Sequence, residues 1–327
     1  MDAVSPSNDH PIALKKQFII GGPVTCVYLP SKEYCWVGKG CFLERFTLEG
    51  SHENCQRYTI FPDGGTVHGL RQNGEIMVIF GGRKVSVWKS RDDTDLAKLS
   101  LKSSCSSSKQ DYILASDWIW DLRISPTQQE HVLSKIALAL ANNACEIWII
   151  CNDLSVQRTH KINGSTRSLT YSMSLHGWQN RSPELILASG TVFNEIIIWT
   201  VMDAAEAVPV TTRHDTHRLR GHHGVILSVQ FSEDGMMLAS TSDDRSVRLW
   251  KYENAGWQCA WVSWGHSARV WSIAFSSVGL VSTAEDASAR IWDLLNGNQL
   301  GEIRSYTCHS LWRVNVFENW ALIGGND

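Results

Sequence analysis

Two stretches of the sequence each combine a histidine, a serine and an aspartate, the residue types of a hydrolase triad. In such a triad the serine is the nucleophile, the histidine is the general base and the aspartate orients the histidine. No G-x-S-x-G nucleophile elbow accompanies either set. Each set begins at a Gly-His dipeptide, and the two sets are His222, Ser240 and Asp244, and His266, Ser282 and Asp286.

A tryptophan completes each set at a fixed distance. The serine lies ten residues and the aspartate six residues before Trp250 in the first set and before Trp292 in the second. This repeated spacing resembles the structural tetrad of WD-repeat propellers, in which His, Ser, Asp and Trp form a chain of hydrogen bonds. A buried polar group without a partner costs about 1–3 kcal/mol, so such a chain stabilises only when every member is bonded. We therefore predict a structural role for both sets and no catalysis.

The elements that position these residues are short strands. Between the tryptophans, β-rich runs alternate with turn residues, and no long amphipathic helix is indicated. Five of the runs end in tryptophan, with intervals of 60, 51, 51 and 42 residues, and the shortest interval is typical of a WD repeat. These tryptophans are Trp88, Trp148, Trp199, Trp250 and Trp292.

This pattern predicts an all-β fold, a WD-repeat β-propeller of about six full blades plus half of a seventh. We expect residues 1–327 to form this single propeller, truncated in its last blade, so that the ring is incomplete at the C-terminus. A fragment, a truncated isoform and an incomplete gene model are the alternatives for that truncation. Residues 12–20 are a candidate for the outermost strand of the last blade, and Asp327 falls where Asp244 and Asp286 lie in theirs.

Composition limits the functional classes. Hydrophobic residues make up 43% of the 327 residues and charged residues 19%, which excludes a disordered chain. The net charge of −3 does not favour nucleic-acid binding by charge alone, so any such role needs a local patch or a partner. Nine cysteines without a C-x-x-C pair suit reduced thiols, and no metal site is predicted. With neither a signal peptide nor a membrane span in the sequence, we expect a cytoplasmic protein.

A second set of tryptophans begins the predicted innermost strands. Trp120, Trp271 and Trp312 share one position, and we place Leu169 and Leu227 at the same position in other blades. Arg269 and Arg167 lie two residues earlier, and Arg313 follows Trp312. These tryptophans either pack between blades or line one mouth of the central channel, where aromatic and arginine side chains bind unpaired bases or a protein partner. Asp121 and Arg123 point the same way on their strand, so an internal ion pair is expected there.

Sequence segments that are less general than the tetrads indicate a particular family. The segments "SDWIWDLR", "SDDRSVRLWK" and "GHSARVWSIAF" resemble the N-terminal propeller of the WD repeat-containing protein 6 family. The resemblance is dense over residues 116–148 and 221–292 and weak before residue 90. Family members are longer, with further propellers.

The resemblance implies a non-catalytic scaffold or regulatory subunit that positions tRNA. Its partners would be an FtsJ-like tRNA 2′-O-ribose methyltransferase, which modifies the wobble nucleotide, and the tRNA anticodon region. S-adenosylmethionine would belong to the partner enzyme, and no cofactor is expected in this chain. The alternative is a general protein-interaction propeller, such as a signalling or ubiquitin-ligase adaptor, with no RNA role.

Overall fold

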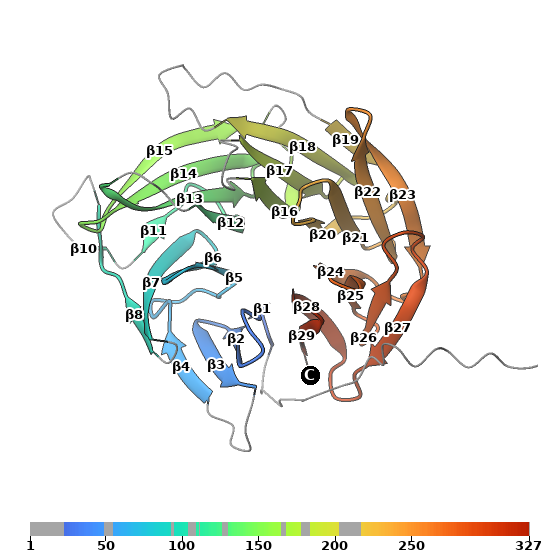
Figure 1. Cartoon of the computed structure of the whole chain (residues 1–327), viewed down its shortest axis with the longest axis horizontal. Coiled ribbons are helices and arrows are strands. Elements are labelled where there is room, and N and C mark those ends of the chain that lie inside the picture. The colour runs from blue at the N-terminus through green and yellow to red at the C-terminus, as the bar shows by residue number, and fades with distance from the viewer. Residues whose placement is uncertain are drawn as a thin grey trace, which may run out of the picture.

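The computed structural model describes residues 23–48, 55–92, 95–103, 109–110, 112–125, 130–164, 168–177, 184–202 and 217–326. Within these residues, seven β-sheets follow one another around a central channel, as Figure 1 shows. The innermost strands of the seven sheets are β1, β5, β12, β16, β20, β24 and β28, and they surround the channel. The all-β propeller predicted from the sequence is confirmed.

The first three sheets come from the N-terminal half of the chain, and their neighbouring strands pair antiparallel except β15 with β9. Sheet 1 contains β1 (Cys26–Tyr28), β2 (Tyr34–Lys39), β3 (Phe42–Thr47) and β4 (Cys55–Thr59). Sheet 2 contains β5 (Gly69–Asn73), β6 (Ile76–Gly81), β7 (Lys84–Asp92), β8 (Asp95–Lys98) and β11 (Ile113–Leu114). Sheet 3 contains β12 (Ile119–Ser125), β13 (Val132–Leu140), β14 (Ala144–Cys151), β15 (Ser155–Asn163), β9 (Leu101–Ser103) and β10 (Lys109–Gln110).

The remaining four sheets are more regular. Sheet 4 contains β16 (Thr170–Gly177), β17 (Glu184–Thr191), β18 (Glu195–Met202) and β19 (His217–Arg220). Sheet 5 contains β20 (Ile226–Phe231), β21 (Met237–Ser242), β22 (Ser246–Glu253) and β23 (Gly256–Trp264). Sheet 6 contains β24 (Val270–Ser276), β25 (Gly279–Ala284), β26 (Ser288–Trp292) and β27 (Gln299–Arg304), and sheet 7 contains β28 (Ser310–Phe317) and β29 (Trp320–Asn326).

The seventh sheet has two strands in the described part of the chain, as the sequence predicts. These two strands nevertheless join sheet 6 to sheet 1. The Val24 N–H donates to the Gly325 carbonyl at 3.2 Å, and the Leu29 N–H donates to Asn315 Oδ1 at 2.8 Å. Seven innermost strands therefore surround the channel (Figure 1). Residues 12–20 and Asp327 lie outside the described residues.

Apolar side chains fill the spaces between neighbouring sheets rather than a single central core. One cluster joins sheets 2 and 3 through Val78, Val87, Ile136 and Leu138, all with no exposed surface. Equivalent clusters lie between the other neighbouring pairs, including sheets 7 and 1. Neighbouring sheets cover both faces of the inner part of each sheet, so strands there, such as β6 and β25, are buried along their whole length. The polar side chains of the innermost strands line the channel instead of packing between sheets.

Candidate functional site

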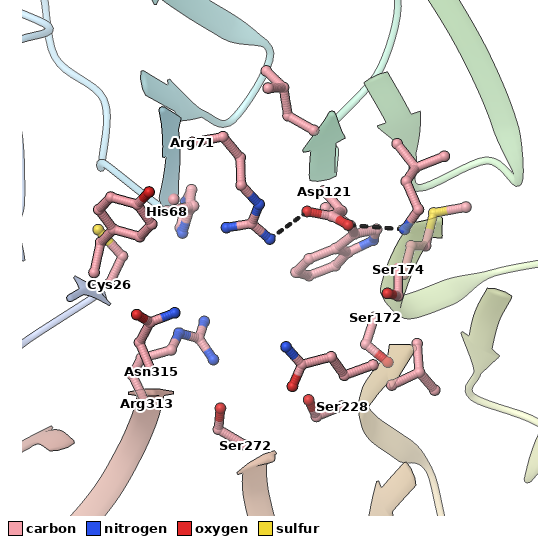
Figure 2. A pocket seen from close by; sticks show the side chains of 18 of the residues that line it. Cys26, His68, Arg71, Asp121, Ser172, Ser174, Ser228, Ser272, Arg313 and Asn315 are labelled. Atoms are coloured by element: carbon pink, nitrogen blue, oxygen red, sulfur yellow. Dashed lines mark hydrogen bonds and ion pairs between the residues drawn. The ribbon is translucent and has the colours of Figure 1, made fainter. Parts of the chain in front are cut away.

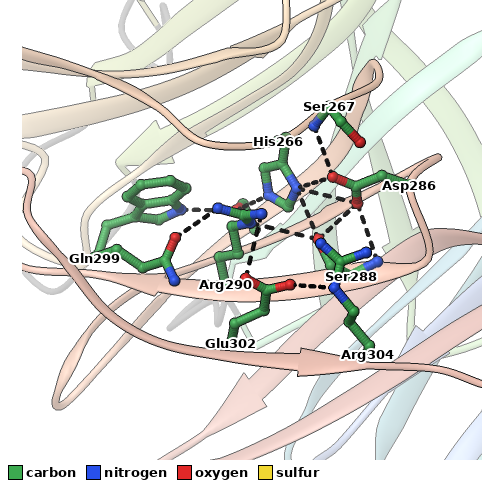
Figure 3. Close-up of polar contacts among 10 residues, drawn as sticks. His266, Ser267, Asp286, Ser288, Arg290, Gln299, Glu302 and Arg304 are labelled. Carbon is green, nitrogen blue, oxygen red and sulfur yellow. Dashed lines mark hydrogen bonds and ion pairs between the residues drawn. The ribbon is translucent and has the colours of Figure 1, made fainter.

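The structure brings the four residues of the predicted tetrad in sheet 6 together. His266 Nδ1 lies 3.1 Å from Asp286 Oδ2 (Figure 3), and His266 Nε2 lies 2.8 Å from Ser282 Oγ. Ser282 Oγ also accepts the Trp292 indole N–H at 2.7 Å. The serine therefore donates its own proton to His266, and His266 donates to Asp286. Each member is bonded, as a buried polar chain requires.

The same chain forms in sheet 5. His222 Nδ1 lies 3.0 Å from Asp244 Oδ2, and His222 Nε2 lies 2.9 Å from Ser240 Oγ. The Trp250 indole donates to Ser240 Oγ at 2.9 Å. Asp244 also accepts the backbone N–H of His223 at 2.8 Å. This bond joins the loop before β20, which contains His223, to the turn between β21 and β22, which contains Asp244.

Burial excludes both tetrads from substrate chemistry. The His222 and His266 side chains are 1% and 0% exposed, so no substrate reaches them. Burial lowers the pKa of His222 and keeps its imidazole neutral. Burial is the largest single effect on the pKa of Asp244 and Asp286 and acts to raise it, but the tetrad histidine, a serine hydroxyl and a backbone N–H together outweigh it, and both pKa values lie well below the usual range. The arrangement holds loops in place.

The glycine of each Gly-His dipeptide makes room for an arginine. A Cβ at Gly221 would lie 2.5 Å from Arg248 Nη1, and a Cβ at Gly265 would lie 2.5 Å from Arg290 Nη1. Gly221 also has a φ of 154°, which L side chains rarely adopt. Arg290 in turn donates to Gln299 at 2.6 Å and pairs with Glu302 at 3.2 Å, as Figure 3 shows.

Sheet 4 contains a related network that the sequence analysis missed. Ser189 Oγ donates to Asn143 Oδ1 at 2.7 Å, and the Trp199 indole N–H donates to the same oxygen at 3.0 Å. Asn143 is buried in the turn of the preceding sheet, where it takes the place of a tetrad histidine. The available signal was the ten-residue interval between Ser189 and Trp199, which equals the interval in both tetrads.

The tryptophans that begin the inner strands occupy β-bulges. In five sheets the pairing of the two innermost strands shifts by one residue near the start of the inner strand. The extra residue lines the channel at the end where the inner strand begins, and we refer to this end as the mouth. We call these five residues the bulge column: Trp120, Tyr171, Leu227, Trp271 and Trp312. The placement of Leu169 in this column was wrong, because Leu169 precedes β16 and is 63% exposed, and Tyr171 occupies the bulge.

Aromatic rings continue across three neighbouring sheets at this mouth. The ring centroids of His68 and Trp118 are 4.9 Å apart, those of Trp118 and Trp120 6.2 Å, and those of Trp120 and Tyr171 5.7 Å with near-parallel planes. We call these four residues the aromatic arc. Trp118 and Tyr171 are each 39% exposed, so their faces are accessible to a ligand. Trp271, on the other side of the channel, is partly buried.

The predicted arginines take different positions. Arg269 pairs with Asp243 at 3.2 Å and with Glu285 at 2.9 Å, and its guanidinium carbon lies 5.5 Å from the Trp271 ring centroid. Its charge is thus balanced within the protein. Arg167 lies outside the described residues, and Arg313 points into the channel (Figure 2).

The channel is a cavity of about 970 Å³, lined by the inner strands of all seven sheets. In Figure 2, polar side chains point into it from every side. Asp121 accepts Arg71 Nη2 at 2.6 Å and the Leu175 backbone N–H at 2.9 Å. The predicted ion pair between Asp121 and Arg123 was therefore wrong. Arg123 donates to the Leu175 carbonyl at 3.5 Å instead, because the neighbouring sheet supplies Arg71 to the same carboxylate.

Four side chains of the channel that can carry a positive charge have pKa values lowered mainly by burial: His68, Arg123, His176 and Arg313. Burial and the nearby Arg313 charge lower the pKa of His68 to about 4, so His68 is neutral at pH 7. Burial also lowers the pKa of Arg313. Arg313 Nε donates to the Thr25 carbonyl at 3.0 Å, and Nη1 donates to the Trp312 carbonyl at 3.4 Å. In the described residues no carboxylate pairs with Arg313.

Other kinds of site are not found in the described part of the chain. No group of three or more His, Cys, Asp or Glu side chains there is arranged to hold a metal ion. None of its elements is a helix with the length and apolar character to cross a membrane.

Comparison with known proteins finds two WD repeats and several similar sequences. Residues 213–251 and 257–293 match the model of the WD domain, G-beta repeat. The chain is 31% identical over 228 residues to the mouse tRNA (34-2'-O)-methyltransferase regulator WDR6, and 30% identical over 228 residues to the human protein. Both matches cover 65% of this chain and 18% of the relative. The Drosophila melanogaster WDR6 regulator is 25% identical over 267 residues, which covers 76% of this chain and 26% of the relative.

The two matched repeats contain the two tetrads, and the chain spans less than a third of the length of these relatives. The resemblance found in the sequence is thereby confirmed: the chain is a WD-repeat β-propeller similar to the WDR6 regulators.

Proposed function

We propose that this chain is a non-catalytic regulatory subunit that positions tRNA for 2′-O-ribose methylation of the wobble nucleotide by a partner methyltransferase in the cytoplasm. The observation that carries the proposal is the similarity to proteins named tRNA (34-2'-O)-methyltransferase regulators. The burial of both His-Ser-Asp sets supports a non-catalytic role. The enzyme partner would be FtsJ-like and would bind S-adenosylmethionine, and the anticodon region would be the part of the tRNA that this chain contacts.

The aromatic arc supports contact with unpaired bases. Unpaired anticodon bases can stack on aromatic side chains, and each such base contributes about 1–3 kcal/mol to binding. Trp118 and Tyr171 offer accessible ring faces on either side of Trp120. The bulge column continues around the mouth to Trp271 and Trp312. We infer that bases stack on the arc and that the rest of the column shapes the mouth.

The test is binding of an anticodon stem-loop RNA to wild type and two variants, by fluorescence anisotropy at several salt concentrations. Trp118→Ala and Tyr171→Ala should each weaken binding about tenfold while the chain remains folded. Tyr306→Ala is the matched control, because Tyr306 is 97% exposed and lies outside the channel. Equal affinities for all variants, or no RNA binding by wild type, would contradict an RNA contact at the arc.

The cellular test measures 2′-O-methylation of the wobble nucleotide by mass spectrometry of tRNA from cells with and without the gene. Loss of the modification without the gene is expected. An unchanged modification would refute the proposed role and would favour the alternative, a protein-interaction propeller with no RNA role. In that case, proteins that bind to the wild-type chain but not to Trp118→Ala would be the candidates for a partner that binds at the aromatic arc.

A further inference from the structure

The channel lining contains more arginines than carboxylates. Arg71, Arg123 and Arg313 all belong to it, and Asp121 is already bonded to Arg71 and to a backbone N–H. Glu233 is the other carboxylate among the lining residues, and no ion pair joins it to these arginines in the described residues. The lining thus has three arginines and two carboxylates, and of the two carboxylates Asp121 forms an ion pair with a described residue while Glu233 does not.

Arg313 is the least balanced of the three. Its two hydrogen bonds go from Nε and Nη1 to backbone carbonyls, and its Nη2 group has no hydrogen-bond partner among the described residues. The nearby Cys26 thiol does not supply a negative charge, because burial raises its pKa to about 12. A buried guanidinium without an anion is costly, and a bidentate oxyanion is the partner that fits its planar set of donors.

Hydroxyl groups complete the surroundings of this charge. Ser172, Ser228 and Ser272 occupy the same position in three successive inner strands, directly after the bulge, and Arg313 occupies that position in the fourth. The Ser172 hydroxyl donates to the Ile226 carbonyl at 3.3 Å, whereas Ser272 Oγ accepts the Val314 N–H and keeps its own proton, so Ser228 and Ser272 are the hydroxyl donors for an anion. All four side chains are directed into the channel in Figure 2. Hydroxyl groups and a guanidinium are the donors that commonly bind phosphate oxygens. The cavity volume of about 970 Å³ accommodates a phosphate or a nucleotide.

We propose that the central channel binds a phosphate-class oxyanion between Arg313 and the serine hydroxyls. The oxyanion is either free or the terminal phosphate of a nucleotide whose base lies against the aromatic arc. This site goes beyond the proposed function, because a small anion can occupy it without any tRNA or methyltransferase.

The experiment measures thermal unfolding of the whole chain at pH 7 in increasing inorganic phosphate, against sodium chloride at equal ionic strength. A ligand that binds the folded state raises the midpoint with concentration, so phosphate should raise it more than chloride does. Arg313→Met should weaken the phosphate affinity at least about tenfold. Arg218→Met is the control, since Arg218 lies on the outer strand of sheet 4 and Glu195 keeps Arg220 as its partner.

A second variant keeps the test decisive if Arg313→Met does not fold. Ser228→Asp places a carboxylate in the channel, which should abolish the phosphate effect and raise the midpoint in chloride. Equal midpoints in phosphate and chloride for wild type would overturn the proposal. So would a phosphate effect that survives in Ser228→Asp or in folded Arg313→Met.

Two further ligands distinguish the sources of the phosphate. Adenosine monophosphate binding more tightly than inorganic phosphate, with adenosine inactive, would assign the site to a nucleotide phosphate. Equal affinity for both phosphates would assign it to a free oxyanion. The RNA-binding test of Trp118→Ala and Tyr171→Ala is independent, so either proposal can fail without the other.

Discussion

Removal of the Asp286 carboxylate should be among the most destabilising single changes in the chain. Asp286 accepts hydrogen bonds from His266 Nδ1 at 3.1 Å, from the Ser267 N–H at 2.8 Å, and from the Ser288 N–H at 3.0 Å and its hydroxyl at 2.6 Å. Its side chain is 3% exposed. His266 and Ser288 are the buried residues among these donors, and each buried donor left without a partner costs about 1–3 kcal/mol, so Asp286→Ala should lower the free energy of unfolding by about 2–6 kcal/mol. Typical domains have about 5–15 kcal/mol in total.

Urea unfolding followed by fluorescence measures this loss. The midpoint should fall while the slope with urea stays constant, because the variant changes stability and not the surface exposed on unfolding. Asp293→Ala is the control, since Asp293 accepts two backbone N–H groups in a turn of the same blade, where water can replace it. The expected cost there is about 1 kcal/mol or less. Equal losses for the two variants would refute the reasoning that the tetrad is a connected, buried network.

Three other perturbations follow from the structure. Asn143→Ala should lower the free energy of unfolding by about 2–4 kcal/mol in urea, because Trp199 and a serine lose their shared acceptor. Arg158→Ala should cost about 3–5 kcal/mol in the same assay, since it leaves the fully buried Glu146 without its cation. The free energy of unfolding should decrease as the pH falls from 6.5 to about 4, because unfolded His68 takes up a proton that folded His68 resists, and His68→Gln should reduce this slope.

The sequence predicted the blades because their signals are local. In five sheets the third main strand carries a tryptophan, and in two of them a Gly-His dipeptide precedes the inner strand; these signals lie within one repeat, so spacing alone identifies them. The network of Asn143 is different. Asn143 is the acceptor and lies in a turn of the preceding sheet, 46 residues from the donor Ser189 and 56 from the donor Trp199. The pairing of Asp121 with Arg71 also joins two sheets, 50 residues apart. Contacts between blades have no fixed spacing in the sequence.

The misplaced residue of the bulge column has a related cause. Leu169 and Tyr171 are two residues apart, and side chains two apart on a strand point the same way. A shift of two therefore leaves the alternation of apolar and polar residues unchanged, so the pattern cannot choose between them. The bulge decides the register, and it depends on how β16 pairs with β17.

The bulges also explain why aromatic and polar groups meet at this mouth. An extra residue in a strand breaks the pairing once and then restores it. In five sheets that extra residue belongs to the bulge column, and the next residue lines the channel. The next residues are Asp121, Ser172, Ser228, Ser272 and Arg313. One backbone feature, repeated in five sheets, therefore places a bulky apolar or aromatic side chain next to a polar or charged one along the wall of the same channel.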